Sequence, residues 1–154
     1  MKAIHWIVAA AALAFVQPAQ AATTDPEIII YRFPGVRDDG SANSVGVATS
    51  FHCTNFSGVT ETIRWVTRDF DGTLKSNASL MIGHLGTVTA STHGTNAYSE
   101  TGLATGAVAQ GTTAIAATSI NVICTAVTID ASTAAPIGVA LRGIRFSPVP
   151  GSQE

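Results

Sequence analysis

Apolar and polar residues alternate with a period of two along much of this chain, and this pattern constrains its fold most. Between Ser44 and Thr54 the odd positions are mostly apolar and the even positions are small or polar. Such alternation is typical of a strand with one buried face. After residue 21, no stretch of ten or more residues shows the 3.6-residue spacing of a helix. The chain is therefore expected to fold from strands.

Further segments of strand character follow at short intervals. They cover residues 27–33, 62–70, 73–82, 86–92, 112–117, 120–129 and 137–146. Asp71-Gly72 between two of them is a hairpin signal, and Gly102–Gly111 reads as a loop with Leu103 as its apolar contact. The segment 120–129 is apolar on both faces, which places it inside a sheet. We predict an all-β fold, an antiparallel β-sandwich of seven to nine strands.

The same alternation selects the side chains expected between the two sheets. A residue is a core candidate when it is large and apolar and lies on the apolar face of its strand. The predicted core comprises Val47, Phe51, Ile63, Trp65, Val122, Ile144 and Phe146.

The N-terminus has the three parts of a cleavable signal peptide, in the required order. Lys2 supplies a positive charge, Ile4–Val16 is an apolar run, and Ala19-Gln20-Ala21 is a small-residue cleavage site. The run of about 13 residues is too short to span a hydrocarbon core of about 30 Å. We predict a signal peptide helix over residues 1–21 and a single β-sandwich domain over residues 22–154. The mature protein would be secreted, to the periplasm or the extracellular medium, with no membrane span.

Cys53 and Cys124 are the only cysteines of the chain. In an exported protein such a pair is expected to form a disulfide. Closing a loop of about 70 residues stabilises a fold by about 4 kcal/mol in the chain-entropy description. The alternative is two unpaired thiols.

The order Cys53, Trp65 and Cys124 resembles the Cys…Trp…Cys spacing of immunoglobulin domains. In that family the disulfide joins the two sheets and the tryptophan packs on it. The resemblance implies an immunoglobulin-like sandwich with Cys53–Cys124 between its sheets. Val122 stands where the family has the tyrosine of its tyrosine corner. A bridge between neighbouring strands of one sheet would give the same spacing.

Charge excludes some classes of partner. Charged residues make up 12% of the chain, against about 25% in an average domain. Loss of Lys2 with the signal peptide leaves 7 basic and 10 acidic side chains, a formal charge of −3. This small and scattered charge argues against nucleic acid or an anionic membrane as a partner.

The segment Asp69-Phe70-Asp71-Gly72-Thr73 looks like the first motif of haloacid-dehalogenase-type phosphotransferases. The resemblance implies Asp69 as the nucleophile and Asp71 as the acid/base, with magnesium nearby. That fold needs parallel strands joined by crossover helices, and the pattern of this chain predicts none. The other interpretation is a hairpin turn, in which glycine accepts a positive φ.

Metal ligands are sparse in this sequence. Asp38-Asp39-Gly40 and the pair Asp69 and Asp71 could each offer oxygens to calcium, but Ca²⁺ takes six to eight. The histidines after the signal peptide are His52, His84 and His93, and they share no regular spacing. We therefore expect no metal, no cofactor and no catalytic residue; Asp69 and Asp71 are the residues to test if a metal does bind.

Three classes of function remain open. The first is a secreted binding or interaction module without catalysis, whose protein or glycan partner is unknown. The second is a structural subunit of a surface fibre or coat, which self-associates through an edge strand. The third is a metal-assisted hydrolase that uses the acidic turns.

Overall fold

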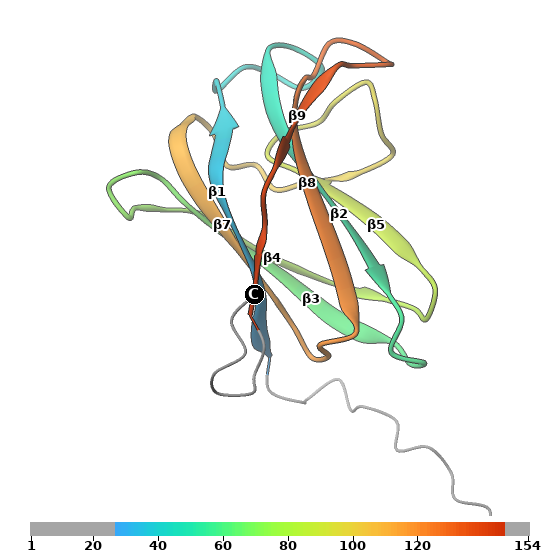
Figure 1. The fold of residues 1–154 in the computed structure, drawn as a ribbon. Coiled ribbons are helices and arrows are strands. Elements are labelled where there is room, and N and C mark those ends of the chain that lie inside the picture. Colours follow the sequence, from blue (N-terminus) through green and yellow to red (C-terminus); the bar gives the residue numbers. More distant parts are fainter. Residues whose placement is uncertain (1–26, 147–154) are drawn as a thin grey trace, which may run out of the picture.

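The computed structural model describes residues 27–146 as two packed β-sheets, as Figure 1 shows. The predicted signal peptide lies outside the described residues. No helix in the described part of the chain is long and apolar enough to cross a membrane. The strands are β1 (Ile28–Asp38), β2 (Val47–Asn55), β3 (Glu61–Arg68), β4 (Leu74–Ile82), β5 (Thr87–Ser91), β6 (Thr101–Gly102), β7 (Val108–Ala117), β8 (Val122–Asp130), β9 (Gly138–Leu141) and β10 (Ile144–Arg145).

Sheet A has the strand order β10-β1-β7-β3-β4, and sheet B has the order β6-β5-β2-β8-β9. All neighbouring strands are antiparallel except β5 and β6, which run parallel. The prediction of an all-β, sandwich-like fold is thus confirmed. The β3–β4 hairpin turns at Asp71-Gly72 as the sequence indicates, and Gly72 has a φ of 84°.

The structure contains ten strands rather than the predicted seven to nine. One added strand is β6, which has only two residues. The other arises because the segment 137–146 divides into β9, which pairs with β8 in sheet B, and β10, which pairs with β1 in sheet A. Gly143 permits this crossing, since a Cβ there would lie 2.4 Å from the Phe33 ring.

The disulfide between Cys53 and Cys124 lies within sheet B. The two residues are directly opposite one another on β2 and β8, with Cα atoms 4.2 Å apart. The bridge between two sheets that the immunoglobulin resemblance implies is therefore wrong, and the alternative of neighbouring strands holds. Trp65 belongs to the opposite sheet, in the same buried cluster as both cysteines.

Most of the predicted core is confirmed. Phe51, Ile63, Trp65 and Val122 are buried between the sheets, and Leu103 closes the core from the loop before β7. The prediction of Ile144 as a core residue is wrong. Its side chain is 48% exposed, because β10 forms the edge of sheet A. The predicted core residues Val47 and Phe146 are only partly buried.

Candidate functional site

The end of β1 and the loop after β5 meet in a cluster of polar residues. Asp38, Asp39 and His93 bring ligand-type atoms within 4.8 Å of one another. His93 Nδ1 lies 2.9 Å from Asp38 Oδ2, and Thr105 Oγ1 donates to the same oxygen at 3.1 Å. The sequence placed Asp38-Asp39 and His93 in separate turns and gave no sign that they meet.

Both ring nitrogens of His93 are used in this cluster. Nε2 lies 3.0 Å from the carbonyl oxygen of Val45. A carbonyl can only accept, so Nε2 donates this bond. Nδ1 is engaged by Asp38 Oδ2, so both ring nitrogens have a partner within the protein. The pair is buried, and no lone pair of His93 is free for a metal.

Asp39 is held by the backbone of the loop that follows it. Its carboxylate accepts hydrogen bonds from the amides of Val47 at 3.0 Å and Ser41 at 3.1 Å. These bonds, that of Val47 first, lower the pKa of Asp39. A Cβ on Gly46 would lie 2.0 Å from Oδ2, so only glycine leaves room for this carboxylate. The hydrogen bonds of this cluster thus link three loops and stabilise the fold at this end of the sandwich.

The carboxylates of Asp69 and Asp71 also stabilise the turn in which they lie. Asp71 Oδ1 accepts the amide of Thr73 at 2.8 Å, and this bond is the main cause of a lowered pKa of Asp71. Asp69 Oδ1 accepts the amide of Phe70, and Oδ2 lies 3.6 Å from Lys75 Nζ. The turn joins two antiparallel strands. The parallel setting of the phosphotransferase motif is absent from the described residues, and that interpretation is wrong.

A chain of hydroxyl groups and one carboxylate lies on the outer face of sheet B. Ser50 Oγ and Ser91 Oγ are 2.7 Å apart, and Ser91 Oγ donates to Glu100. Glu100 also accepts the amide of Thr95, which closes the loop 92–100 over this face. Both serines are fully buried, so neither is accessible as a nucleophile. Glu100 is a lone acid in a loop, and no sequence signal marks it.

His52 lies beside this chain. Its Nδ1 is 3.0 Å from Thr89 Oγ1, and its ring packs edge-on against Tyr98 at 4.6 Å between centroids. Burial lowers the pKa of His52, and the charge of Glu100 opposes that shift. His84 makes a different kind of contact: its Nδ1 accepts a hydrogen bond from the amide of Gly58. The described residues thus hold their three histidines in three different settings.

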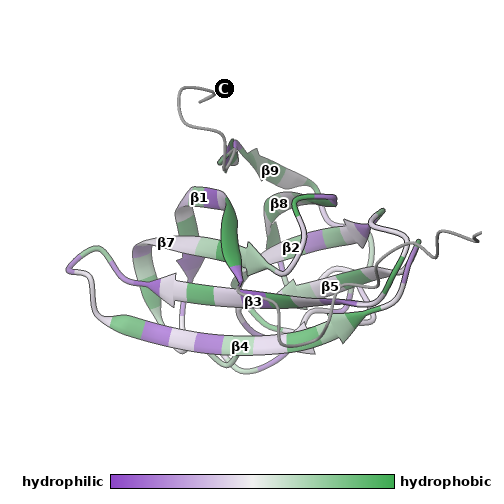
Figure 2. Cartoon of the chain, turned by 90° about the horizontal axis from the view of Figure 1, so that it is seen from below, coloured by the Kyte–Doolittle hydropathy of each residue, from purple (hydrophilic) through white to green (hydrophobic). Residues whose placement is uncertain are grey.

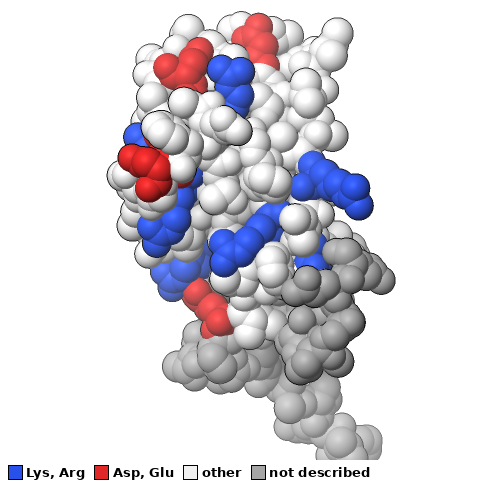
Figure 3. Space-filling view, turned by 60° about the vertical axis from the view of Figure 1, so that its left-hand side comes forward, with Lys and Arg blue, Asp and Glu red and all other residues white. Residues whose placement is uncertain are grey.

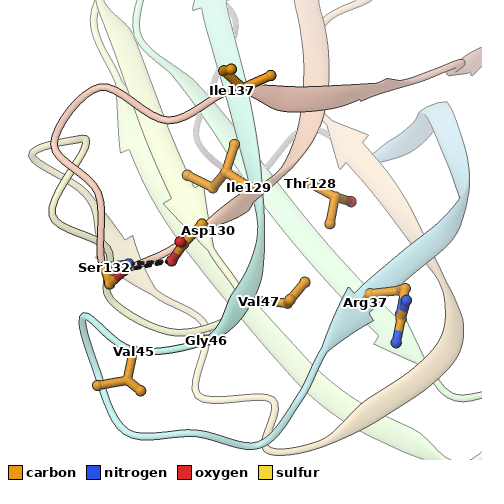
Figure 4. Close-up of a pocket in the computed structure, with 9 residues that line it drawn as sticks. All are labelled: Arg37, Val45, Gly46, Val47, Thr128, Ile129, Asp130, Ser132 and Ile137. Carbon is orange, nitrogen blue, oxygen red and sulfur yellow. Dashed lines mark hydrogen bonds between the residues drawn. The ribbon is translucent and has the colours of Figure 1, made fainter.

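An open depression of about 570 Å³ lies where β1 and the ends of β2 and β8 come together. Figure 4 shows Arg37 at one side, Val45 and Ser132 at the other, and Ile137 above them. We call this region the side depression; it is lined by Arg37, Val45, Gly46, Val47, Thr128, Ile129, Asp130, Ser132 and Ile137.

Two of the aliphatic side chains that line the side depression are exposed, while Ile129 is buried. Ile137 is 98% exposed, and Val45 and the nearby Val139 are also exposed. One cation and one carboxylate stand at the rim, from Arg37 and Asp130. The pKa of Asp130 is lowered, first by the hydrogen bond from the side chain of Ser132. Sequence reasoning did not find this region, because its residues come from four separate segments.

The basic side chains are distributed unequally between the two sheets. All seven Lys and Arg residues of the described part lie on strands of sheet A or, for Arg142, between β9 and β10, and several appear together in Figure 3. Several are already paired. Arg64 binds Glu27 through Nε at 2.5 Å and Nη2 at 2.9 Å, and this contact raises the pKa of Arg64. Arg68 and Arg145 donate to carbonyl oxygens.

No protein-family model, curated protein or solved structure matches this chain.

Proposed function

We propose that the mature chain is a secreted interaction module without catalysis, and that the side depression is its partner site. The observation that most supports this proposal is the exposure of aliphatic side chains there, above all that of Ile137, which is 98% exposed. Exposed apolar side chains gathered in one place mark interaction sites on small soluble proteins. The depression also lies on loops and strand ends, where a sandwich commonly presents its recognition residues.

The remaining polar groups support the same proposal. The carboxylates of Asp38, Asp39, Asp69 and Asp71 accept hydrogen bonds from neighbouring amides or side chains and thereby shape loops. A general base or a nucleophile needs a free lone pair directed at a substrate. Each of these carboxylates commits at least one oxygen to a hydrogen bond within the protein.

The chemistry of the depression fits a protein segment better than a sugar. Its apolar lining is aliphatic, from Val45, Val47, Ile129 and Ile137, and it contains no aromatic ring. Arg37 and Asp130 at the rim can pair with one acidic and one basic group of a partner. We therefore expect a peptide segment with an aliphatic anchor flanked by charged residues.

A displayed random peptide library, panned against the mature protein, tests this proposal. Peptides that bind the wild type should lose at least tenfold in affinity against Val45→Asp/Ile137→Asp. They should retain it against Asn121→Asp/Thr125→Asp, which adds the same charge at two exposed positions, Asn121 just before β8 and Thr125 on β8. Binding that is indifferent to the first variant would remove the side depression from the proposal.

The hydrolase alternative is tested separately, with turnover of generic phosphate and ester substrates. Activity that is present in the wild type and lost in Asp69→Asn would overturn a non-catalytic function. Activity that is equal in both would also overturn a non-catalytic function, and it would exclude Asp69 as the source.

Export is tested by sequencing the N-terminus of the protein recovered outside the cytoplasm. A mature chain that begins at Ala22 would support the predicted signal peptide. The Cys53–Cys124 disulfide supports export as well, because oxidising compartments are where such bonds persist.

A further inference from the structure

Strand β4 forms an uncovered edge of sheet A. Figure 2 shows it along the outside of the sheet, and its only strand neighbour in the described residues is β3. Its nine residues contain neither proline nor glycine, and their register with β3 is unbroken from Ser76 to Ile82. Apart from the ladder with β3, no backbone-to-backbone hydrogen bond joins Leu74–Met81 to another described segment. A long edge of this kind is a template for a further strand.

The opposite edge of sheet A is protected against such pairing. The two-residue β10 covers Tyr31 and Arg32 of β1, and the rest of β1 forms the edge. There β1 carries Pro34, which has no amide hydrogen, and its register with β7 shifts on both sides of Val36. The Thr49 hydroxyl accepts the amide of Arg37 at 3.0 Å and donates to its carbonyl at 2.8 Å, which occupies both backbone groups of Arg37. β4 has no proline and a regular register from Ser76 to Ile82, and Lys75 is its one charged residue.

The sequence of β4 is apolar at both ends, so its reversal places one apolar end opposite the other. Leu74 stands at one end and Leu80–Ile82 at the other, with polar residues between them, as the colours of Figure 2 show. An antiparallel pairing centred on Ala78 places the exposed Leu74 beside the end of β4 in a second copy, where Ile82 is buried in its own core. A two-fold axis makes each such contact twice, which is the requirement for a closed dimer.

Exposed apolar side chains beyond the two ends of β4 fit the same axis. Phe70 at the tip of the β3–β4 hairpin is 74% exposed, and Leu85 in the turn after β4 is 64% exposed. The pairing centred on Ala78 brings the hairpin tip of one copy beside the β4–β5 turn of the other. Ala78 and Leu80, which pack against the core but stay partly exposed, would be covered at the same time.

Charge does not oppose this arrangement. Lys75 is the only charged residue of β4, and it lies near Asp69 of its own hairpin. In the pairing centred on Ala78, Lys75 faces Met81 of the other copy. The two lysines are then six residues apart along the strands, roughly 20 Å, which exceeds the screening length of about 8 Å at physiological salt.

From these observations we propose that two copies of this chain form a closed dimer by antiparallel pairing of β4 with β4, centred on Ala78. The paired strands join the two copies of sheet A into one continuous sheet. β4 and the side depression lie at opposite edges of the sandwich, since the depression includes β1 residue Arg37. The dimer does not depend on the proposed partner site, and it would present two copies of that site facing away from the joint.

Two matched variants test both the dimer and its register. Asn77 and Ser79 lie on the solvent side of β4 and face each other across the proposed axis. Asn77→Asp/Ser79→Asp places four carboxylates at the joint. Arg64, which contacts Asn77 and pairs with Ser79, offsets that charge within each copy. Asn77→Asp/Ser79→Lys instead places opposite charges across the axis.

The experiment is sedimentation equilibrium of the mature protein from a host without N-glycosylation, with hydrogen exchange of the β4 amides measured alongside. We expect a wild-type dimer with protected β4 amides and at least tenfold weaker association of Asn77→Asp/Ser79→Asp. Asn77→Asp/Ser79→Lys should remain dimeric, as should the distant control Asn121→Asp/Thr125→Asp. Circular dichroism confirms that each variant is folded.

The dimer would be overturned by a wild type that stays monomeric at every concentration, by a doubly acidic variant that dimerises as the wild type does, or by an oppositely charged variant that associates as weakly as the doubly acidic one. Open assemblies larger than a dimer would also overturn it and would favour the fibre subunit. Peptide binding by Asn77→Asp/Ser79→Asp, measured in parallel, shows whether the side depression binds its partner independently of the dimer.

Discussion

His93 and Asp38 form a buried pair that ties the two sheets together at one end of the sandwich. Asp38 ends β1 of sheet A, and His93 follows β5 of sheet B, with 2.9 Å between Nδ1 and Oδ2. The side chains are 8% and 1% exposed. The pair is therefore shielded from solvent, and removing one member leaves the other without its partner in a poorly hydrated place.

Asp38→Ala should lower the free energy of unfolding by about 3 kcal/mol, because it leaves Nδ1 of the buried His93 without its hydrogen-bond partner. Asp39→Ala is the matched control, since the neighbouring carboxylate is exposed and binds only backbone amides. Its cost should be no more than about 1 kcal/mol. Urea unfolding of both variants gives the comparison, and equal losses would contradict a special role of the buried pair.

Chelation should leave the stability unchanged. Asp38, Asp39 and His93 are close enough to hold an ion, yet each already has hydrogen-bond partners within the protein. The melting temperature should be the same with EDTA, with added Ca²⁺ and with added Zn²⁺. A rise with either ion that disappears in Asp39→Asn would show that the cluster binds metal after all.

Sequence patterns predicted the strands well because strand faces depend on neighbours two residues away. They failed where burial depends on distant segments. The loop 92–100 folds over sheet B, so Ala48 and Ser50 are buried on the face that the alternation assigned to solvent. Asp38 and His93 are 55 residues apart, and no local pattern relates them. The division of the last strand depends on the contact between Gly143 and Phe33, which is equally non-local.

Replacing Ile63 and Ile144 by alanine tests the consequence of dividing the last predicted strand into β9 and β10. Ile63→Ala should cost about 3 kcal/mol, because the side chain is fully buried between the sheets. Ile144→Ala should change the stability by no more than about 0.5 kcal/mol, since its side chain lies on the edge strand and is half exposed. Chemical denaturation of the two variants tests this, and a large loss at Ile144 would place that residue in the core.

The disulfide should contribute mainly by restricting the unfolded chain. Cys53 and Cys124 are separated by 71 residues, which corresponds to about 4 kcal/mol in the chain-entropy description. Cys53→Ala/Cys124→Ala should lose that amount. In the native wild type, both sulfurs are buried, so reductant should act only as fast as the protein opens. Rapid reduction without denaturant would show that sheet B opens locally around the bridge.

His52 should make the stability depend on pH in a defined direction. Burial lowers its pKa below the ordinary value of 6.5, so the folded protein resists protonation there. Below pH 6.5 the unfolded chain binds the proton more readily, and stability falls as the pH falls until the folded pKa is reached. Above pH 6.5 both states are neutral, and this contribution is constant. Urea unfolding at pH 7.5 and pH 5.5 should therefore show a smaller difference in His52→Gln than in the wild type. Thr89→Val, which removes the hydroxyl beside Nδ1 but keeps the ring buried, is the control and should retain the pH dependence. An equal pH dependence in wild type and His52→Gln would assign it to other groups.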